Sequence, residues 1–131
     1  NVPDEPWNDF PEYYPGDGYV DYVGIDGYNW GNTREWSRWR SFREIFLPAY
    51  TRAVKEFGKP VIISEFGSSG QGGNKAVWIR EAMKNIRSWK EVKGFILFNV
   101  DKEVDWSFKP GTESAASFGK SLKSGYFKDE E

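Results

Sequence analysis

Three polar segments of this 131-residue chain each follow an apolar run that has the length of a β-strand. They cover residues 26–31, 65–69 and 99–107. A carboxylate at the end of an apolar strand, such as Glu65, is costly unless it is paired, hydrogen-bonded or chemically active. Tyr28 ends another such run, and its hydroxyl could donate a hydrogen bond that orients this carboxylate. We therefore regard Glu65 and Tyr28 as a candidate catalytic pair.

Structural roles for the same two residues stay open from sequence alone. Glu65 could instead cap a helix or form an ion pair with Lys59 or Lys102. Tyr28 could simply fill the mouth of a barrel, and the two residues together could stabilise this end of the sheet without doing chemistry. Loss of turnover on substitution of Glu65, with binding retained, would distinguish catalysis from these structural roles.

Acidic and aromatic side chains share the third polar segment. Asp101, Glu103 and Asp105 alternate there, but the glycine and the final glutamate that an EF-hand loop needs are missing. We therefore expect a solvated acidic loop, with no metal site and no cofactor. Trp106 either closes over the core or forms the floor of a sugar site, and we favour the second. The same two interpretations apply to three further tryptophans, Trp30, Trp36 and Trp39.

The composition of the chain excludes several kinds of catalysis and several kinds of partner. The chain has no histidine and no cysteine, which excludes Ser-His-Asp and Cys-His catalysis and the usual zinc sites. A net charge of −2 argues against a nucleic-acid partner. No apolar run is long enough for a membrane span, so we expect no membrane partner. Seven Trp, seven Tyr and ten Phe exceed what burial needs in a chain that is 38% hydrophobic, and surplus aromatics suit the apolar faces of sugar rings.

The hydrophobic pattern predicts three strands that alternate with three helices. The strands are expected at 19–28, 61–64 and 93–99, and the helices at 41–57, after Asn74 and at 114–122. Ser41 with Glu44 has the spacing of a capping box, and Asn74 can cap the second helix. Pro48 is expected to separate a short turn from the main part of the first helix, because proline fits best at a first helical position.

Strands that alternate with helices indicate an α/β fold with a parallel sheet and right-handed crossovers. Such sheets carry their chemistry beyond the carboxyl ends of the strands. The three polar segments are therefore expected to converge on one rim of the sheet.

Five segments of the chain have a familiar sequence: Tyr14-Pro15-Gly16, residues 19–31 (YVDYVGIDGYNWG), 59–68 (KPVIISEFGS), 98–103 (FNVDKE) and Asp105-Trp106. In this order they resemble the C-terminal part of glycoside hydrolase family 26, which includes endo-β-1,4-mannanases and enzymes that act on mixed-linkage β-glucan or xylan. Members of this family are retaining enzymes that use two glutamates on a TIM (β/α)8 barrel. The resemblance implies that Glu65 is the nucleophile, that Tyr28 orients it and that Trp106 lines the sugar site.

The resemblance also implies a domain organisation. The chain would be a single partial domain that holds about strands 6 to 8 of the barrel. Residues 1–18 would form the loop after strand five, and the three β/α units would cover 19–58, 59–90 and 91–131. By the same resemblance, Asn29, Trp30, Asp101 and Lys102 are expected to join Trp106 in binding substrate.

The acid/base glutamate of the family lies at the end of strand four and has no counterpart in this chain. Retention needs two carboxyl groups about 5 Å apart, and three strands of eight cannot close a barrel. We therefore expect the chain alone to be inactive. Its partners would be a polysaccharide and the N-terminal half of the barrel, from the same or another chain, or a second copy that pairs through open sheet edges.

Substrate and location are expected from the resemblance only. A plant cell-wall mannan is the first candidate, with lichenan or xylan as alternatives, and such enzymes are normally extracellular. Many mannanases of the family have arginine directly after the site tryptophan, whereas this chain has Ser107. A function of another class also stays open, in which the half-barrel binds carbohydrate or assembles without catalysis.

Overall fold

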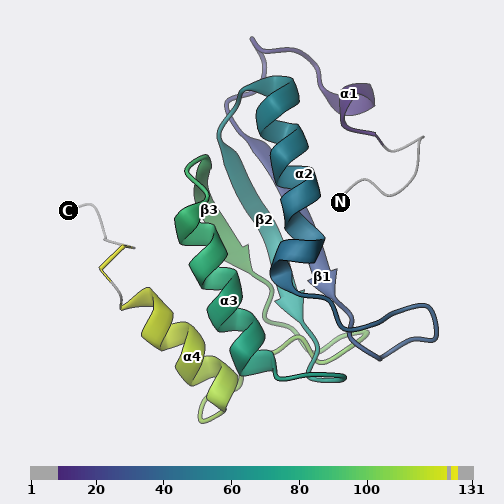
Figure 1. The fold of residues 1–131 in the computed structure, drawn as a ribbon, viewed down its shortest axis with the longest axis vertical. Helices are drawn as coiled ribbons and strands as arrows, with labels where there is room; N and C mark the ends of the chain where they lie inside the picture. The colour runs from purple at the N-terminus through teal and green to yellow at the C-terminus, as the bar shows by residue number, and fades with distance from the viewer. Residues whose placement is uncertain (1–8, 124, 127–131) are drawn as a thin grey trace.

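The computed structural model describes residues 9–123, 125 and 126. Strands and helices alternate along the chain after one short N-terminal helix (Figure 1). The elements in order are α1 (Phe10–Tyr13), β1 (Val23–Asn29), α2 (Phe42–Phe57), β2 (Val61–Ser68), α3 (Lys75–Ser88), β3 (Val92–Leu97) and α4 (Glu113–Leu122). The predicted α/β alternation is confirmed.

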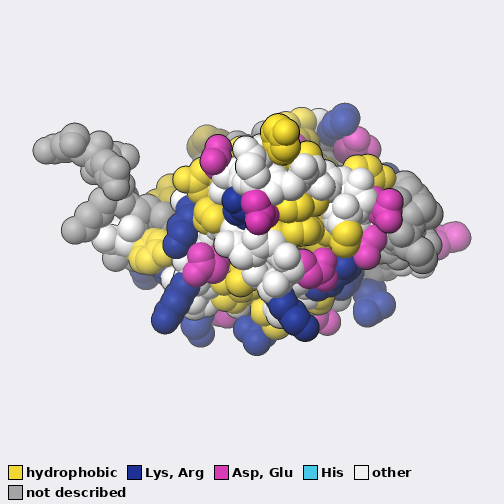
Figure 2. Space-filling model, turned by 90° about the horizontal axis from the view of Figure 1, so that it is seen from above, with side chains coloured by type: hydrophobic (Ala, Val, Ile, Leu, Met, Phe, Trp, Pro, Cys, Tyr) yellow, Lys and Arg dark blue, Asp and Glu magenta, His cyan; other side chains and the backbone are white. Residues whose placement is uncertain are grey.

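The three strands form one parallel sheet in the order β1-β2-β3. Helices α2 and α3 lie across one face of this sheet, and α4 lies beside α3 (Figure 1). Within the described part of the chain, no helix covers the opposite face, which we call the open face. Figure 2 looks onto the rim at the amino ends of the strands, where hydrophobic side chains lie among charged ones.

The N-terminal boundary of the first strand differs from the prediction. The chain makes a turn over residues 16–19, in which the Tyr19 amide donates to the Gly16 carbonyl at 3.1 Å. Gly16 has a φ of 111°, a conformation that suits glycine. Pairing with β2 starts only at Val23, so residues 19–22 precede the strand. The expected loop at 1–18 contains helix α1, and its residues 1–8 lie outside the described residues.

Helix α2 has the predicted start and end but not the predicted break. The Ser41 and Glu44 side chains each accept from the other's backbone amide, which completes the capping box, and Gly58 ends the helix with a φ of 61°. Pro48 lies inside one continuous helix. A proline leaves the carbonyl four residues earlier without its amide donor, and here the Arg40 guanidinium donates to the Glu44 carbonyl at 2.9 Å. This substitute bond lets the helix pass through Pro48.

The other two helices begin with side-chain caps. The Asn74 side chain accepts from the Val77 amide at the start of α3, as predicted. Thr112 caps α4 in the same way by accepting from the Ala115 amide. These caps fix where each helix leaves the loop that follows a strand.

The hydrophobic core lies between the sheet and the helices that cover it. Its buried members come mainly from the three strands and from the faces of α2 and α3 that cover them, and they include Ile25, Phe42, Phe46, Ile63, Phe66, Trp78, Ile79 and Met83. Phe42 stacks on Phe46 with centroids 4.4 Å apart and meets Phe66 edge to face at 5.8 Å. Within the described residues, no helix is both long and apolar enough to span a membrane.

Candidate active site

Strand β2 runs further than predicted and carries Glu65 within it. The strand continues to Ser68, and its pairing with β1 shifts register near Glu65, which lies opposite Asp26. Such a shift changes the direction of a side chain relative to strict alternation. Ile63 and Phe66 on either side of Glu65 are buried in the core, whereas Glu65 itself is only partly buried.

The Tyr28 hydroxyl donates a hydrogen bond to Glu65 Oε2 across the two neighbouring strands. Burial of the phenol, together with the Glu65 carboxylate beside it, raises the pKa of Tyr28 above its ordinary value. The phenol therefore keeps its proton throughout the neutral range and remains a donor to Glu65. The predicted Tyr28–Glu65 contact is present in the structure.

The sequence left open an ion pair between Glu65 and Lys59 or Lys102. In the structure both lysines bond to other groups. The Lys59 ammonium donates to the Asp17 carbonyl at 2.9 Å. Lys102 lies 3.0 Å from the Glu103 carboxylate. The recorded hydrogen-bond partner of the Glu65 carboxylate is thus an uncharged phenol, which orients the carboxylate without neutralising its charge.

Glu65 and Tyr28 line a cavity of about 350 Å³ at the carboxyl ends of the strands. The remaining lining residues come from the loops after β1 and β3: Trp30, Phe98, Lys102, Glu103 and Trp106. The Trp106 ring lies 5.0 Å from the rings of both Tyr28 and Trp30, measured between centroids. A carboxylate among aromatic rings is suited to an uncharged ligand with apolar faces, such as a pyranose.

Gly67 lies against the aromatic rings that cover β2. A Cβ atom at this position would lie 3.4 Å from the Tyr28 ring and 3.5 Å from the Trp106 ring, which is ordinary van der Waals contact, so a side chain that extends beyond Cβ would meet these rings. The place of Gly67 two residues after Glu65 is a sequence signal that another group lies close to the strand.

The loop after β3 holds Trp106 in a fixed position. Trp106 is 1% exposed, so it packs closely while its ring lines the cavity. Lys75, at the start of α3, donates to the backbone carbonyls of Asp105 at 3.2 Å and Ser107 at 2.9 Å, which are the residues before and after Trp106. Its ammonium also lies 4.6 Å from the Phe108 ring. Helix α3 is thereby tied to the cavity wall.

The acidic residues of this loop occupy different places. Glu103 lines the cavity, which the expectation of a solvated acidic loop missed. The ammonium of Lys102 lowers the pKa of Glu103, with a smaller effect from the Trp106 indole. Asp101 lies outside the cavity lining, 3.7 Å from the Lys109 ammonium. Of the two predicted sugar contacts here, Lys102 reaches the cavity and Asp101 does not. Among the residues that the structure describes, no acidic cluster could hold a metal ion.

Asn29 lies on the other side of the strand from the cavity. It is 1% exposed, and its amide donates to the Ser68 hydroxyl at 2.9 Å. Its side-chain oxygen accepts from the amides of Gly31 and Arg40 at 3.2 and 2.9 Å. These bonds use the side chain to hold the loop after β1, and Asn29, which was expected to bind substrate, is not among the residues that line the cavity.

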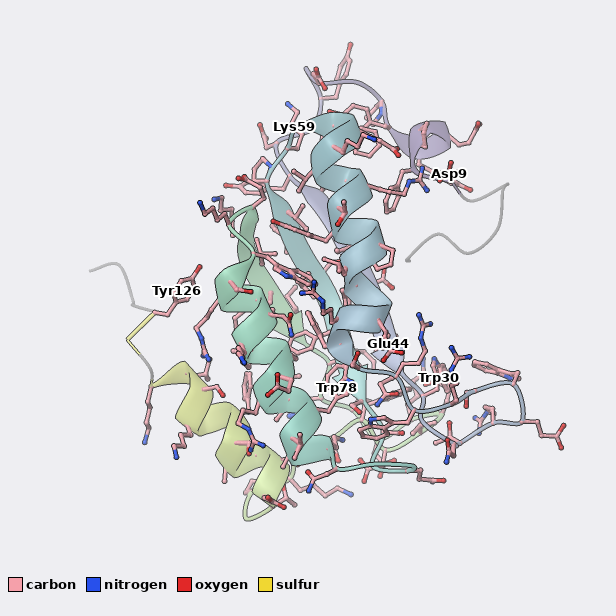
Figure 3. All side chains as sticks on the ribbon, in the orientation of Figure 1. Asp9, Trp30, Glu44, Lys59, Trp78 and Tyr126 are labelled. Carbon is pink, nitrogen blue, oxygen red and sulfur yellow. The ribbon has the colours of Figure 1, made fainter. Side chains whose placement is uncertain are left out.

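The three tryptophans whose role the sequence left undecided lie in three different environments. Trp30 lines the cavity and lies on the loop at the lower right of Figure 3. Trp39 packs against the backbone of Gly73, where a Cβ atom would approach its ring to 2.4 Å. Trp36 is 72% exposed. The expectation that at least one of them packs structurally is met by Trp39.

Comparison with known proteins identifies the family of the chain. The sequence model of glycosyl hydrolase family 26 matches residues 1–107. The chain is 46% identical over 115 residues to Endoglucanase H of Acetivibrio thermocellus, an alignment that covers 86% of this chain and 13% of that protein. The chain thus spans a small part of the length of this relative. The match over most of its residues shows that the chain belongs to glycosyl hydrolase family 26.

Proposed function

We propose that this chain supplies the nucleophile side of the active site of a retaining endo-β-glycanase. Glu65 would be the nucleophile and Tyr28 its orienting partner. The observation that carries the proposal is the hydrogen bond from the Tyr28 hydroxyl to Glu65 inside an aromatic cavity at the carboxyl ends of parallel strands. In α/β sheets this end is where chemistry is concentrated.

In the first step, a Glu65 oxygen attacks the anomeric carbon of the sugar that occupies the cavity. A carbon–oxygen bond forms to Glu65, the glycosidic bond breaks, and a second carboxylic acid gives its proton to the leaving oxygen. In the second step, water attacks the same carbon, the deprotonated second group takes up the water's proton, and Glu65 leaves as a carboxylate. The Tyr28 hydroxyl would hold Glu65 in the attacking orientation throughout.

The second carboxyl group is proposed to come from outside this chain. A general acid in such an enzyme needs a raised pKa so that it still carries its proton near neutrality. Glu103 also lines the cavity, but the neighbouring Lys102 ammonium lowers its pKa. Glu103 is therefore poorly suited to protonate a leaving group, and its place at the cavity suggests a role in binding sugar hydroxyls.

We further propose that β1, β2 and β3 are strands six to eight of a barrel that the preceding polypeptide completes. The open face supports this, because Ile96 on β3 is 58% exposed and Tyr28 and Glu65 are only partly covered. Closure of the sheet would bury that face and remove its two free edges. By this proposal the isolated chain lacks both a closed barrel and the acid, and does not turn over substrate.

A β-1,4-linked or mixed-linkage β-glucan is the proposed substrate class. Two observations favour glucan over mannan: the similar protein carries the name endoglucanase, and Ser107 follows Trp106 where many mannanases of the family have arginine. Mannan and xylan remain alternatives, and an assay on all three polymers separates them. Since a polymer of this kind is degraded outside the cell, we propose an extracellular location.

The test uses the intact polypeptide that carries this chain. Glu65→Ala should lower kcat by at least about 10⁴-fold while oligosaccharide binding is retained. Azide should restore part of the turnover of this variant by entering the space of the lost carboxylate, and should yield a glycosyl azide of inverted configuration. The matched control is Glu81→Gln, an exposed glutamate on α3 that should leave kcat unchanged.

Three results would decide against the proposal. Unchanged turnover in Glu65→Ala would remove Glu65 from the mechanism. Loss of turnover that follows loss of thermal stability, with no rescue by azide, would assign to Glu65 and Tyr28 a structural role at the end of the sheet. Binding without any turnover in the intact parent protein would favour the non-catalytic carbohydrate-binding alternative.

A further inference from the structure

Three tryptophan rings lie in series from the floor of the cavity to the protein surface. Trp106 is 1% exposed, Trp30 is partly exposed, and Trp36 is 72% exposed. The Trp30 ring lies 5.0 Å from Trp106 on one side and 5.4 Å from Trp36 on the other, measured between centroids. Trp36 therefore extends the aromatic lining of the cavity outward by one ring.

The loop that carries Trp36 is braced from inside and from the neighbouring loop. The Ser37 hydroxyl donates to the Gly31 carbonyl at 2.7 Å, and the Ser37 amide donates to the Arg34 carbonyl at 3.1 Å. The Arg34 guanidinium lies 5.7 Å from the Trp30 ring and donates to the Glu103 carbonyl at 3.2 Å. A loop held by these bonds presents Trp36 in one arrangement, which lowers the ordering cost of binding a ligand on it.

We propose that Trp36 forms an outer sugar-stacking subsite, which takes a pyranose ring of the same polysaccharide chain whose neighbouring ring occupies the cavity. This inference rests on the proposed function for the class of ligand. A large exposed aromatic side chain that continues a cavity lining is typical of a surface that a ligand covers. Pyranose rings have apolar faces that pack on an indole.

The charges near Trp36 favour an uncharged ligand over an ionic one. Arg34 already contacts the Trp30 ring and donates to two backbone carbonyls, those of Thr33 and Glu103. At the cavity mouth, the Lys102 ammonium pairs with the Glu103 carboxylate at 3.0 Å. Arg34, Lys102 and Glu103 thus already have partners. Glu35 and Arg38, which flank Trp36, carry opposite charges, so no net charge beside the exposed indole favours an ionic ligand.

The experiment measures binding of β-linked disaccharides and hexasaccharides, both gluco and manno, to the intact protein. A Glu65→Gln background prevents cleavage during calorimetry. Trp36→Ala should weaken hexasaccharide binding by about tenfold and leave disaccharide binding unchanged, because only the longer chain reaches beyond the cavity. Trp36→Phe keeps an aromatic face, so its affinity for the hexasaccharide should fall less than that of Trp36→Ala. Tyr19→Ala removes an aromatic side chain that is 85% exposed before β1, away from the cavity, and should change neither affinity.

Equal losses for the disaccharide and the hexasaccharide would overturn the outer subsite, since a general disturbance of the cavity would explain them. No loss for either ligand would also overturn it. A third result would also overturn the subsite. The fluorescence of Trp36 in the ligand-free intact protein is obtained by subtracting the signal of Trp36→Phe, and if a quencher does not reach it, other polypeptide covers this ring. Failure of the parent protein to bind any oligosaccharide would contradict the proposed function together with this subsite, whereas the other three results contradict the subsite alone.

Discussion

The two faces of the sheet differ in what their side chains do. On the helix-covered face, side chains such as Ile63 and Phe66 are fully buried among other apolar groups. On the open face and its carboxyl rim, Tyr28 and Glu65 are only partly covered and contact each other through a polar hydrogen bond. Ile96, also on the open face, is largely exposed. One face is thus apolar and buried, whereas the other is partly exposed and carries the hydrogen-bonded polar pair.

This difference teaches that the buried anchors and the residues of the proposed chemistry are separated within single strands. Along β2, Ile63 and Phe66 anchor the strand to the helices, and the register shift between them gives Glu65 a direction of its own. Rigid anchors on both sides of a catalytic group keep it in place without using the group itself for stability. Substitutions on the two faces should therefore have opposite effects on stability and activity.

The largest contrast is expected between Phe46→Ala and Glu65→Ala in the intact protein. Phe46 is fully buried on α2, so its loss should lower the free energy of unfolding by about 3–5 kcal/mol while kcat per folded molecule changes little. Glu65→Ala should show the reverse, with near-normal unfolding and lost turnover. Denaturant unfolding and steady-state kinetics on the same samples give both quantities. Loss of both properties in both variants would break the separation of the two faces.

A second comparison asks whether the open face is covered in the intact protein. Ile96→Asp should destabilise it by about 3–5 kcal/mol, because closure of the barrel would bury the new charge without a partner. Val77, on the outer side of α3, is 40% exposed, and Val77→Asp should stay within about 0.5 kcal/mol because it lies in the first turn of a helix. Urea unfolding measures both changes. If Ile96→Asp and Val77→Asp lower the free energy of unfolding by the same small amount, Ile96 remains exposed and no barrel closes over it.

Substitution of Lys75 is expected to have a smaller effect, on KM. This lysine donates hydrogen bonds to the backbone carbonyls of the residues before and after Trp106. Lys75→Met should raise KM by about tenfold with a smaller change in kcat, because the ring that lines the cavity loses its support. Lys75→Arg should restore most of the loss by keeping a donor. Lys109→Met removes an exposed ion pair with Asp105 in the same loop and serves as the control. Equal changes in KM for Lys75→Met and Lys109→Met would mean that Lys75 does not position Trp106.

The smallest effect concerns alkaline pH. Since the folded-state pKa of Tyr28 is raised above 10.0 by burial and by Glu65, the folded protein keeps a proton that the unfolded chain loses. The free energy of unfolding should therefore fall as pH rises above 10.0, with the contribution of Tyr28 fully present below that pH. In Tyr28→Phe this part of the pH dependence should disappear, as measured by urea unfolding at a series of pH values. Identical slopes in the two proteins would contradict the burial and hydrogen bonding of this phenol.

The helix-covered face could be predicted well from the sequence because local signals determine it. The Ser41–Glu44 spacing gave the start of α2, Asn74 gave the start of α3, and Gly58 gave the end of α2. Pro48 was misjudged because its effect depends on a side-chain donor just before the helix, the Arg40 guanidinium, which satisfies the Glu44 carbonyl. That bond depends on a side-chain conformation, which residue spacing does not specify.

The contact between Tyr28 and Glu65 could be predicted from the sequence, whereas the positions of the residues around this pair could be predicted less well. The expected place of Glu65 and Tyr28 near the carboxyl ends of neighbouring strands was sufficient to bring them together, because parallel strands align these ends, although Glu65 lies inside β2. The length of β2, the burial of Asn29 and the entry of Glu103 into the cavity depend on register and loop conformation, which single-residue types do not determine. Gly67 was a usable signal for the close ring packing, and it was overlooked.

The most direct test of the central claim is covalent trapping of Glu65 in the intact protein. A 2-deoxy-2-fluoro-glycoside with a good leaving group slows both steps but hydrolysis more, so a glycosyl-enzyme accumulates on the nucleophile. Proteolysis and mass spectrometry should then locate the sugar on Glu65, with the label absent from Glu65→Gln. A label on any other carboxylate, or active turnover with inversion of configuration and no label, would contradict the account.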